Sequence, residues 1–187
     1  EFLVNEELVE GQLYQVAAEL DDGGYIIVWH SRDATQDGSG DAIKARIFNA
    51  DGTERTAEFQ INTQTQGNQD DPDITVLTDG SIVVTWTSQD QQDDASGDSI
   101  KARIFDPDGT ESVPEFLVNT ETNLDQAEQR IEALSDGGFI VTWHSFDGQQ
   151  DADGASVKAR VFNADGTERI AEFLVASNTT SDQEAPD

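Results

Sequence analysis

The chain has 187 residues, of which 39 are acidic and 10 are basic, so its formal net charge at pH 7 is −29. Nucleic acids and anionic membrane surfaces attract basic proteins, and this charge therefore excludes both as default partners. The sequence has no cysteine, which excludes a disulfide framework, and no apolar run of roughly eighteen residues, which excludes membrane insertion through a transmembrane helix.

One apolar segment recurs at a constant interval. Trp29, Trp86 and Trp143 are 57 residues apart, and the residues around them repeat as well. A unit of this length without disulfides or a zinc cluster has too small a core to be stable alone. Neighbouring units must therefore bury each other's faces, as in other tandem-repeat proteins.

The chain opens with a short segment that the later repeats share. Residues 1–5 correspond to 58–62, 115–119 and 172–175, and each segment alternates apolar and polar side chains, which predicts a strand. A polar connection such as 63–69 follows, and it contains a glutamine at one repeat position. These glutamines are Gln12, Gln69 and Gln126.

Three further strands are predicted in each repeat. The first covers 14–20, 74–77 and 131–134, and a glycine-containing turn such as Asp22-Gly23-Gly24 leads from it into the tryptophan strand. The last covers 43–48, 100–105 and 157–162. It contains a Lys-Ala-Arg triplet, and we expect its arginine to pair with acidic residues across neighbouring strands. These arginines are Arg46, Arg103 and Arg160.

The tryptophan strand is apolar on both faces. Side chains alternate along a strand, so one face holds Tyr25, Ile27 and Trp29 and the other holds Ile26, Val28 and His30. A two-sided apolar strand in an antiparallel sheet predicts that the sheet lies between two others.

The predicted fold is all-β, with tandem four-stranded antiparallel blades in a β-propeller-like arrangement, either an open arc or part of a ring. An extended β-solenoid-like array is the alternative. The predicted boundaries are a closing strand of a preceding repeat at 1–5, three repeats, and the start of a truncated fourth repeat at 176–187. The three repeats span 6–62, 63–119 and 120–175.

The shared text, EFLVN, then Q, then DGG.IV.WHS, DGSGD, AR.F and DGTE, resembles repeats of very large secreted bacterial proteins that also carry repeats-in-toxin calcium modules and cadherin-like domains. The resemblance covers essentially the whole chain. It implies a secreted or cell-surface location, a calcium-rich setting and an adhesive or spacer role, and it implies no catalytic residue. The glycine-aspartate nonapeptide of the toxin repeats is absent, so calcium binding does not follow from that motif.

Acidic loops after the tryptophan strands are the candidate metal sites. Calcium prefers six to eight oxygen ligands from flexible loops, and aspartates interleaved with glycines can supply carboxylate and carbonyl oxygens. Solvated loops held by side-chain turns are the alternative, because the spacing differs from the EF-hand loop. The candidate calcium ligands are Asp33, Asp37, Asp41, Asp90, Asp94, Asp98, Asp147, Asp151 and Asp153.

No catalytic residue is predicted, and we do not expect an enzyme. The His30–Ser31 pair recurs as His144–Ser145, but Thr87 replaces the histidine in the second repeat, and adjacent strand residues face opposite ways. The tryptophans are expected in the core, although an aromatic face could also stack on a sugar.

The leading functional hypothesis is a non-enzymatic structural or adhesive repeat module of a secreted or cell-surface bacterial protein, with calcium as the cofactor that its acidic loops would take. One alternative is a carbohydrate-binding, lectin-like propeller with an extracellular glycan as its partner. Another is a self-assembling unit, in which identical chains join by inter-chain strand complementation. Neighbouring repeats are the other expected partners.

Overall fold

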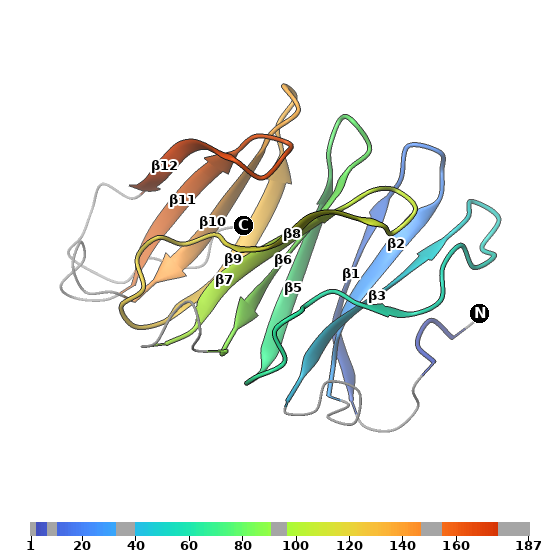
Figure 1. Cartoon of the computed structure of the whole chain (residues 1–187), viewed down its shortest axis with the longest axis horizontal. Coiled ribbons are helices and arrows are strands. Elements are labelled where there is room, and N and C mark those ends of the chain that lie inside the picture. The colour runs from blue at the N-terminus through green and yellow to red at the C-terminus, as the bar shows by residue number, and fades with distance from the viewer. Residues whose placement is uncertain (1–2, 7–10, 33–39, 91–96, 147–154, 176–187) are drawn as a thin grey trace.

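The computed structural model describes residues 3–6, 11–32, 40–90, 97–146 and 155–175. These residues form three four-stranded antiparallel sheets, which fan out side by side (Figure 1). Every strand pairs only within its own sheet, so each sheet is one blade and the predicted propeller-like fold is confirmed. Among the described residues, no helix is long and apolar enough to cross a membrane.

Each blade takes its strands from the chain in sequence order. Blade 1 contains β1 (Gln12–Glu19), β2 (Tyr25–Ser31), β3 (Ala42–Phe48) and β4 (Phe59–Gln60). Blade 2 contains β5 (Gln69–Val76), β6 (Ile82–Ser88), β7 (Ser99–Phe105) and β8 (Glu111–Leu117). Blade 3 contains β9 (Gln126–Ala133), β10 (Phe139–Ser145), β11 (Ser156–Phe162) and β12 (Glu168–Leu174).

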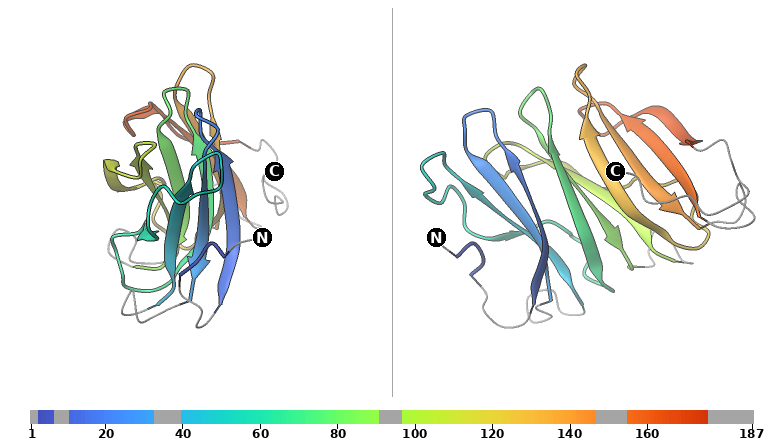
Figure 2. Two further views of the ribbon diagram at one scale, coloured as in Figure 1. Left: turned by 90° about the vertical axis from the view of Figure 1, so that its right-hand side faces the viewer. Right: turned by 180° about the vertical axis from the view of Figure 1, so that it is seen from behind.

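The first strand of each blade lies on the inner side of the arc. β1 contacts β5 and β5 contacts β9, whereas β4, β8 and β12 form the opposite edges of the sheets (Figure 2). The equivalent strands β1, β5 and β9 are thus brought together from three separate parts of the chain.

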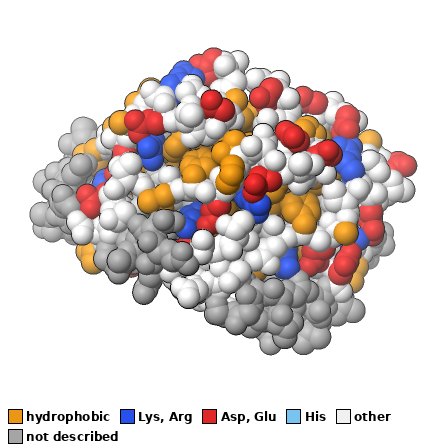
Figure 3. All heavy atoms as spheres, viewed as in Figure 1, with side chains coloured by type: hydrophobic (Ala, Val, Ile, Leu, Met, Phe, Trp, Pro, Cys, Tyr) orange, Lys and Arg blue, Asp and Glu red, His pale blue; other side chains and the backbone are white. Residues whose placement is uncertain are grey.

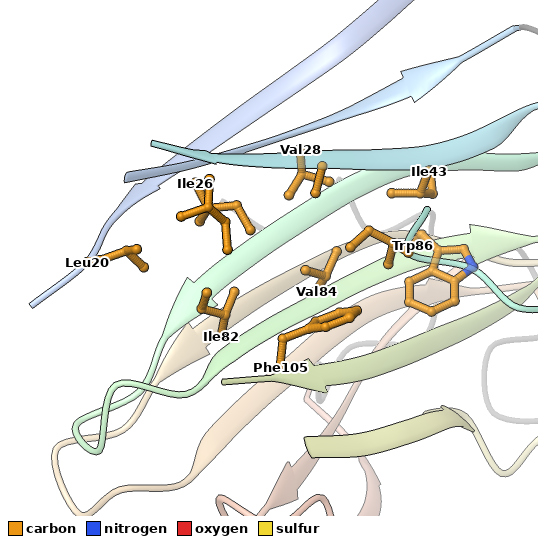
Figure 4. Close-up of a cluster of buried hydrophobic side chains, with 11 residues drawn as sticks. Leu20, Ile26, Val28, Ile43, Ile82, Val84, Trp86 and Phe105 are labelled. Atoms are coloured by element: carbon orange, nitrogen blue, oxygen red, sulfur yellow. The ribbon is translucent and has the colours of Figure 1, made fainter. Parts of the chain in front are cut away.

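An apolar layer joins blade 1 to blade 2. Ile26 and Val28 of β2 face Val84 and Trp86 of β6, and all four are fully buried (Figure 4). The odd-numbered residues of β2 face away from this layer, as the alternation of side chains predicts. Burial of a side chain of this size is worth roughly 1.5–3 kcal/mol, so this layer is a main source of stability.

The same layer is repeated between blades 2 and 3. Val83 of β6 and Ile104 of β7 contact a cluster that includes Val141 and Trp143 of β10. Trp86 and Trp143 are both 0% exposed, so these two tryptophans are core residues at the two blade junctions.

The repeated glutamines bind the repeated tryptophans. The indole Nε1 of Trp86 donates a hydrogen bond of 2.9 Å to Oε1 of Gln69, and Trp143 donates one of 3.0 Å to Gln126. Trp29 makes the same bond to Gln12, at 2.7 Å. The glutamine thus satisfies the one polar atom of a buried indole.

These glutamines begin the inner strands, so the prediction that 63–69 is wholly a connection was wrong at Gln69. A break in register follows each glutamine by a few residues, for example between Asp70 and Asp73. Such a bulge interrupts the alternation by which a strand is detected, and the inner strands were therefore predicted too short.

Arginines of the Lys-Ala-Arg triplets join adjacent blades. Nη1 of Arg103 donates to the carbonyl oxygen of Ile61 at 2.6 Å, and Nη1 of Arg160 donates to that of Val118 at 2.7 Å. Arg46 makes the equivalent bond to Val4, at 3.0 Å. The predicted pairing with acids across the strands is also confirmed, since Arg46, Arg103 and Arg160 pair with Glu54, Glu111 and Glu168.

The outermost strands differ most from the prediction. β8 and β12 begin four residues earlier than expected, directly after the turn, and β4 is reduced to Phe59–Gln60. Residues 3–5 lie in no strand. An edge strand has a partner on one side only, so its extent depends on contacts that the apolar pattern does not record.

On the face shown in Figure 3, hydrophobic, acidic and basic side chains are intermingled.

Candidate functional site

An open groove of about 470 Å³ runs along the inner strands of all three blades. A second hollow of about 480 Å³ shares Asp73 and Arg130 with it and continues along blade 3. The groove is lined by Tyr14, Gln15, Val16, Asp71, Pro72, Asp73, Glu128 and Arg130. Its lining therefore combines one aromatic ring with carboxylates, an amide and a guanidinium group.

The groove residues Tyr14, Asp71 and Glu128 occupy one repeat position and share an unusual backbone. Their φ angles are 51°, 49° and 55°, in the left-handed region that residues other than glycine rarely adopt. Each lies at or beside a register break of its inner strand. Such a bulge re-aims side chains and is often found at functional sites, and here it brings three different side chains to the groove.

Two of the groove carboxylates are already engaged. Asp73 accepts hydrogen bonds from the backbone amides of Ile74 at 2.9 Å and Ile131 at 3.0 Å, and so connects blade 2 to blade 3. A carboxylate oxygen of Glu128 lies 3.2 Å from Nδ1 of His144. Tyr14 stays 59% exposed, and its ring stacks on that of His30 with 5.8 Å between centroids.

His30 forms a second polar cluster, at the junction of blades 1 and 2. Its position on β2 turns the ring toward blade 2, where it is only 2% exposed. Nε2 lies 2.7 Å from Oδ2 of Asp41, and Nδ1 lies 3.3 Å from Oδ1 of Asp70 on β5. Among the described residues this is the one group of three histidine, aspartate or glutamate side chains that could hold a metal ion.

The electrostatic environment of this cluster is strongly negative. Burial raises the pKa of the Asp70 carboxyl group, the nearby His30 opposes this effect, and the carboxylates of Asp41 and Asp71 raise the pKa further. Negative neighbours disfavour the ionised form of a carboxyl group and favour a bound cation or proton.

The three described members of the predicted calcium set lie in different environments. Asp41 is part of the His30 cluster. Asp90 is buried, with its Oδ2 atom 2.5 Å from Nζ of Lys101. Asp98 accepts a hydrogen bond of 3.3 Å from Gln89. The other six residues, Asp33, Asp37, Asp94, Asp147, Asp151 and Asp153, lie outside the described residues.

Sequence reasoning missed the groove residues and Asp70. Tyr14, Asp71 and Glu128 share a repeat position, but it holds a tyrosine in the first repeat and acids in the other two, so the comparison of repeats gives no motif there. Asp70 is likewise matched by Leu13 and Ala127 in the other repeats. The available signal was the near-absence of repetition along these inner strands, within a unit that is otherwise repeated.

Fold and groove together define a propeller-like repeat protein with a polar inner groove. No protein-family model matches the chain, and no curated protein matches it either. The resemblance to repeats of secreted bacterial proteins therefore stays a prediction.

Several solved structures share the fold at low sequence identity. An endo-arabinase from Bacteroides thetaiotaomicron matches with a TM-score of 0.57 and 13% identity, over 95% of this chain and 67% of that one. An α-L-arabinofuranosidase from Lactobacillus brevis matches with a TM-score of 0.56 and 13% identity, over 88% and 57%. An N-acetylgalactosamine deacetylase from F. plautii, in complex with blood group B trisaccharide, matches with a TM-score of 0.52 and 13% identity, over 88% and 53%. The chain thus spans between about half and two thirds of these proteins, and the likeness shows the fold alone.

Proposed function

We propose that this chain is a non-enzymatic adhesive repeat module of a secreted or cell-surface protein, and that it binds glycan in the groove along its inner strands. The observation that carries the proposal is that Tyr14, an exposed ring, lies in one groove with Asp71 and Arg130 from the other two blades. An aromatic ring offers a flat apolar surface to the carbon–hydrogen face of a sugar, and the surrounding polar groups can bond its hydroxyls.

The solved structures of similar fold support a sugar as the ligand but do not identify which sugar. They include an endo-arabinase, an α-L-arabinofuranosidase and a deacetylase in complex with a trisaccharide. One fold can host many activities. The likeness therefore supports a class of ligand, and the activity has to be argued from the residues of the site.

A binding role fits the groove better than hydrolysis. Glycoside hydrolysis normally uses two carboxyl groups, one as acid and one as base or nucleophile. Asp73 holds two backbone amides and Glu128 pairs with His144, so two of the three groove carboxylates have structural partners.

A glycan array followed by calorimetry with the strongest hits tests this proposal. We expect Tyr14→Ala and Asp71→Asn to reduce affinity at least tenfold, which corresponds to about 1.4 kcal/mol. Leu124→Ala is the matched control, since Leu124 is a 54% exposed, left-handed residue that does not line the groove. Binding that is insensitive to both groove variants, or no binding to any glycan, would overturn the proposal. Release of new reducing ends from arabinan or xylan would contradict the non-enzymatic part.

Self-assembly is the second candidate, and Phe173 is the observation that favours it. Phe59 and Phe116 occupy the same repeat position as Phe173 in the two earlier blades. Each packs on a ring of the following blade: Phe59 on Phe105, with ring centroids 5.8 Å apart, and Phe116 on Phe162, at 5.7 Å. Phe173 and Val175 are 40% and 52% exposed. The occupant we propose is blade 1 of a second copy, because blade 1 carries Phe48 and Arg46 at the matching repeat positions.

Such assembly requires Arg46 of blade 1 to exchange one hydrogen-bond acceptor for another. Arg46 now donates to the carbonyl oxygen of Val4, and in the assembly it would donate to that of Val175 from the other copy. We expect sedimentation to show concentration-dependent dimers or longer chains, and Phe173→Ser to abolish them. Phe146→Ser is the control, because Phe146 is 41% exposed but has no counterpart in the blade junctions. A strict monomer at high concentration would contradict this candidate.

A further inference from the structure

The His30 cluster has a geometry that a neutral imidazole ring by itself does not explain. An ionised carboxylate can only accept a hydrogen bond, so the 2.7 Å contact between Asp41 and Nε2 places the ring proton on Nε2. In the neutral imidazole, Nδ1 then carries a lone pair. That atom is buried and has no hydrogen-bond partner among the described residues, although Oδ1 of Asp70 lies 3.3 Å away.

A lone pair and a carboxylate oxygen that face each other at this distance repel unless a cation lies between them. Zinc binds nitrogen at about 2.0–2.1 Å and carboxylate oxygen at about 2.0–2.2 Å, so two ligands on a tetrahedral ion are about 3.3–3.5 Å apart. The separation of Nδ1 and Oδ1 falls in this range. The separation of Nε2 and Asp41 is instead that of a charge-assisted hydrogen bond.

We propose that a divalent transition-metal ion of the zinc class binds between Nδ1 of His30 and Oδ1 of Asp70, with Asp41 holding the imidazole in the tautomer that ligates. A carboxylate on the second ring nitrogen is the usual companion of a metal-bound histidine. Imidazole nitrogen favours zinc, cobalt, nickel or copper over calcium, which prefers oxygen ligands. Water would complete the coordination.

The site belongs to one blade junction only. At the next junction the positions of His30, Asp41 and Asp70 are occupied by Thr87, Asp98 and Ala127. His144 repeats the histidine, but Ala155 stands in the place of Asp41, so its ring lacks the orienting carboxylate. We therefore expect one ion per chain.

Titration of the tag-free, chelator-treated protein with ZnCl₂ and CoCl₂ tests the proposal. Calorimetry should show one site, and cobalt should develop the visible absorption of a low-coordinate complex with a nitrogen ligand. Asp70→Asn should remove binding without unfolding the chain, because the new amide can donate to Nδ1. Asp41→Asn should weaken binding by about 10–100-fold while the stoichiometry stays at one.

Two control variants locate the site. Asp98→Asn and His144→Gln occupy the equivalent repeat positions, and both should leave affinity and stoichiometry unchanged. The proposal is overturned if neither metal binds, if Asp70→Asn binds as tightly as the original chain, or if His144→Gln removes the site. An absence of metal binding would mean that a proton bridges His30 and Asp70, as an imidazolium ion.

Discussion

Trp29 and Trp86 make the same hydrogen bond in different surroundings. Each indole donates to the glutamine that begins the neighbouring inner strand. Trp86 packs into the layer between blades 1 and 2, where it contacts the apolar face of blade 1. Trp29 lies on the face of blade 1 that points away from blade 2, and it lines a hollow of about 240 Å³ together with Val4 and Ile27. The repeated residue is the same, but the amount of packing it supports differs.

This difference predicts unequal costs for one substitution. Trp86→Phe removes the indole nitrogen, leaves Oε1 of Gln69 without its donor and opens a cavity, so we expect the free energy of unfolding to fall by about 2–4 kcal/mol. Trp29→Phe loses the same hydrogen bond beside an existing hollow, and we expect a loss of about 1 kcal/mol. Urea unfolding of the two variants measures the difference. Equal losses would show that the blade layer adds nothing to the role of this tryptophan.

At the scale of the element, the outer strands act as clamps between blades. Glu172 of β12 accepts hydrogen bonds from the backbone amide and hydroxyl of Thr120, at 2.6 and 2.8 Å, and pairs with Lys158 at 3.0 Å. Glu115 of β8 makes the same contacts with Thr63 and Lys101. Lys101 and Lys158 are almost completely buried, so these glutamates also neutralise buried cations. A strand at the edge of one sheet thus fixes the segment that follows the preceding blade.

The clamp at Glu172 predicts a loss of stability in acid. Burial favours the neutral form of this carboxyl group, but hydrogen bonds from Thr120 and Lys158 outweigh it and hold its pKa below the ordinary value of about 4.5. The folded state therefore binds this proton less readily than the unfolded chain. The stabilisation is complete above the unfolded pKa and is lost as the pH falls through the folded pKa.

Glu172→Gln measures this contribution. At pH 7 we expect a loss of about 1.5–3 kcal/mol, because a hydrogen-bonded charge is removed and the buried ion pair between Glu172 and Lys158 is broken. The difference from the original chain should shrink in acid, where both side chains are neutral. Glu168→Gln is the control, since Glu168 is 44% exposed beside Arg160 and exposed pairs contribute only about 0–1 kcal/mol. A difference that is constant with pH would contradict the assigned role of Glu172.

At the scale of the whole molecule, a net charge of −29 acts on the stability of all three blades. Charges of one sign repel each other in the compact state, and salt screens them over a Debye length of about 8–10 Å near physiological ionic strength. Bound divalent cations would reduce the repulsion more locally.

Adding monovalent salts and adding divalent cations to the same protein separate charge screening from specific cation binding. We expect NaCl and KCl to raise the thermal midpoint equally at equal ionic strength, because screening does not depend on the identity of the cation. Calcium should raise the midpoint further than magnesium at the same concentration if the acidic loops bind it, and chelator should reverse the gain. Identical midpoints in calcium and magnesium would argue against specific calcium binding in the loops.

The repeated residues were sufficient to predict the blades, because each has the same structural role in every 57-residue unit. The two-sided apolar strand predicted layers on both faces, and the arginine triplets predicted ion pairs across the strands, as the structure shows at Val28, Val83 and Arg103. The constant positions of Gln69 and Trp86 were visible in the sequence, although the hydrogen bond between them was not.

Only the tertiary structure decided the site, because its residues are those that the repeats do not share. Tyr14, Asp71 and Glu128 meet because three register breaks turn the same position of three inner strands toward one groove. His30 meets Asp70 because side chains alternate along β2 and blade 2 packs against the face that carries the histidine. Repetition in the sequence therefore determined the architecture, and the packing of one blade on the next determined which unrepeated side chains come together.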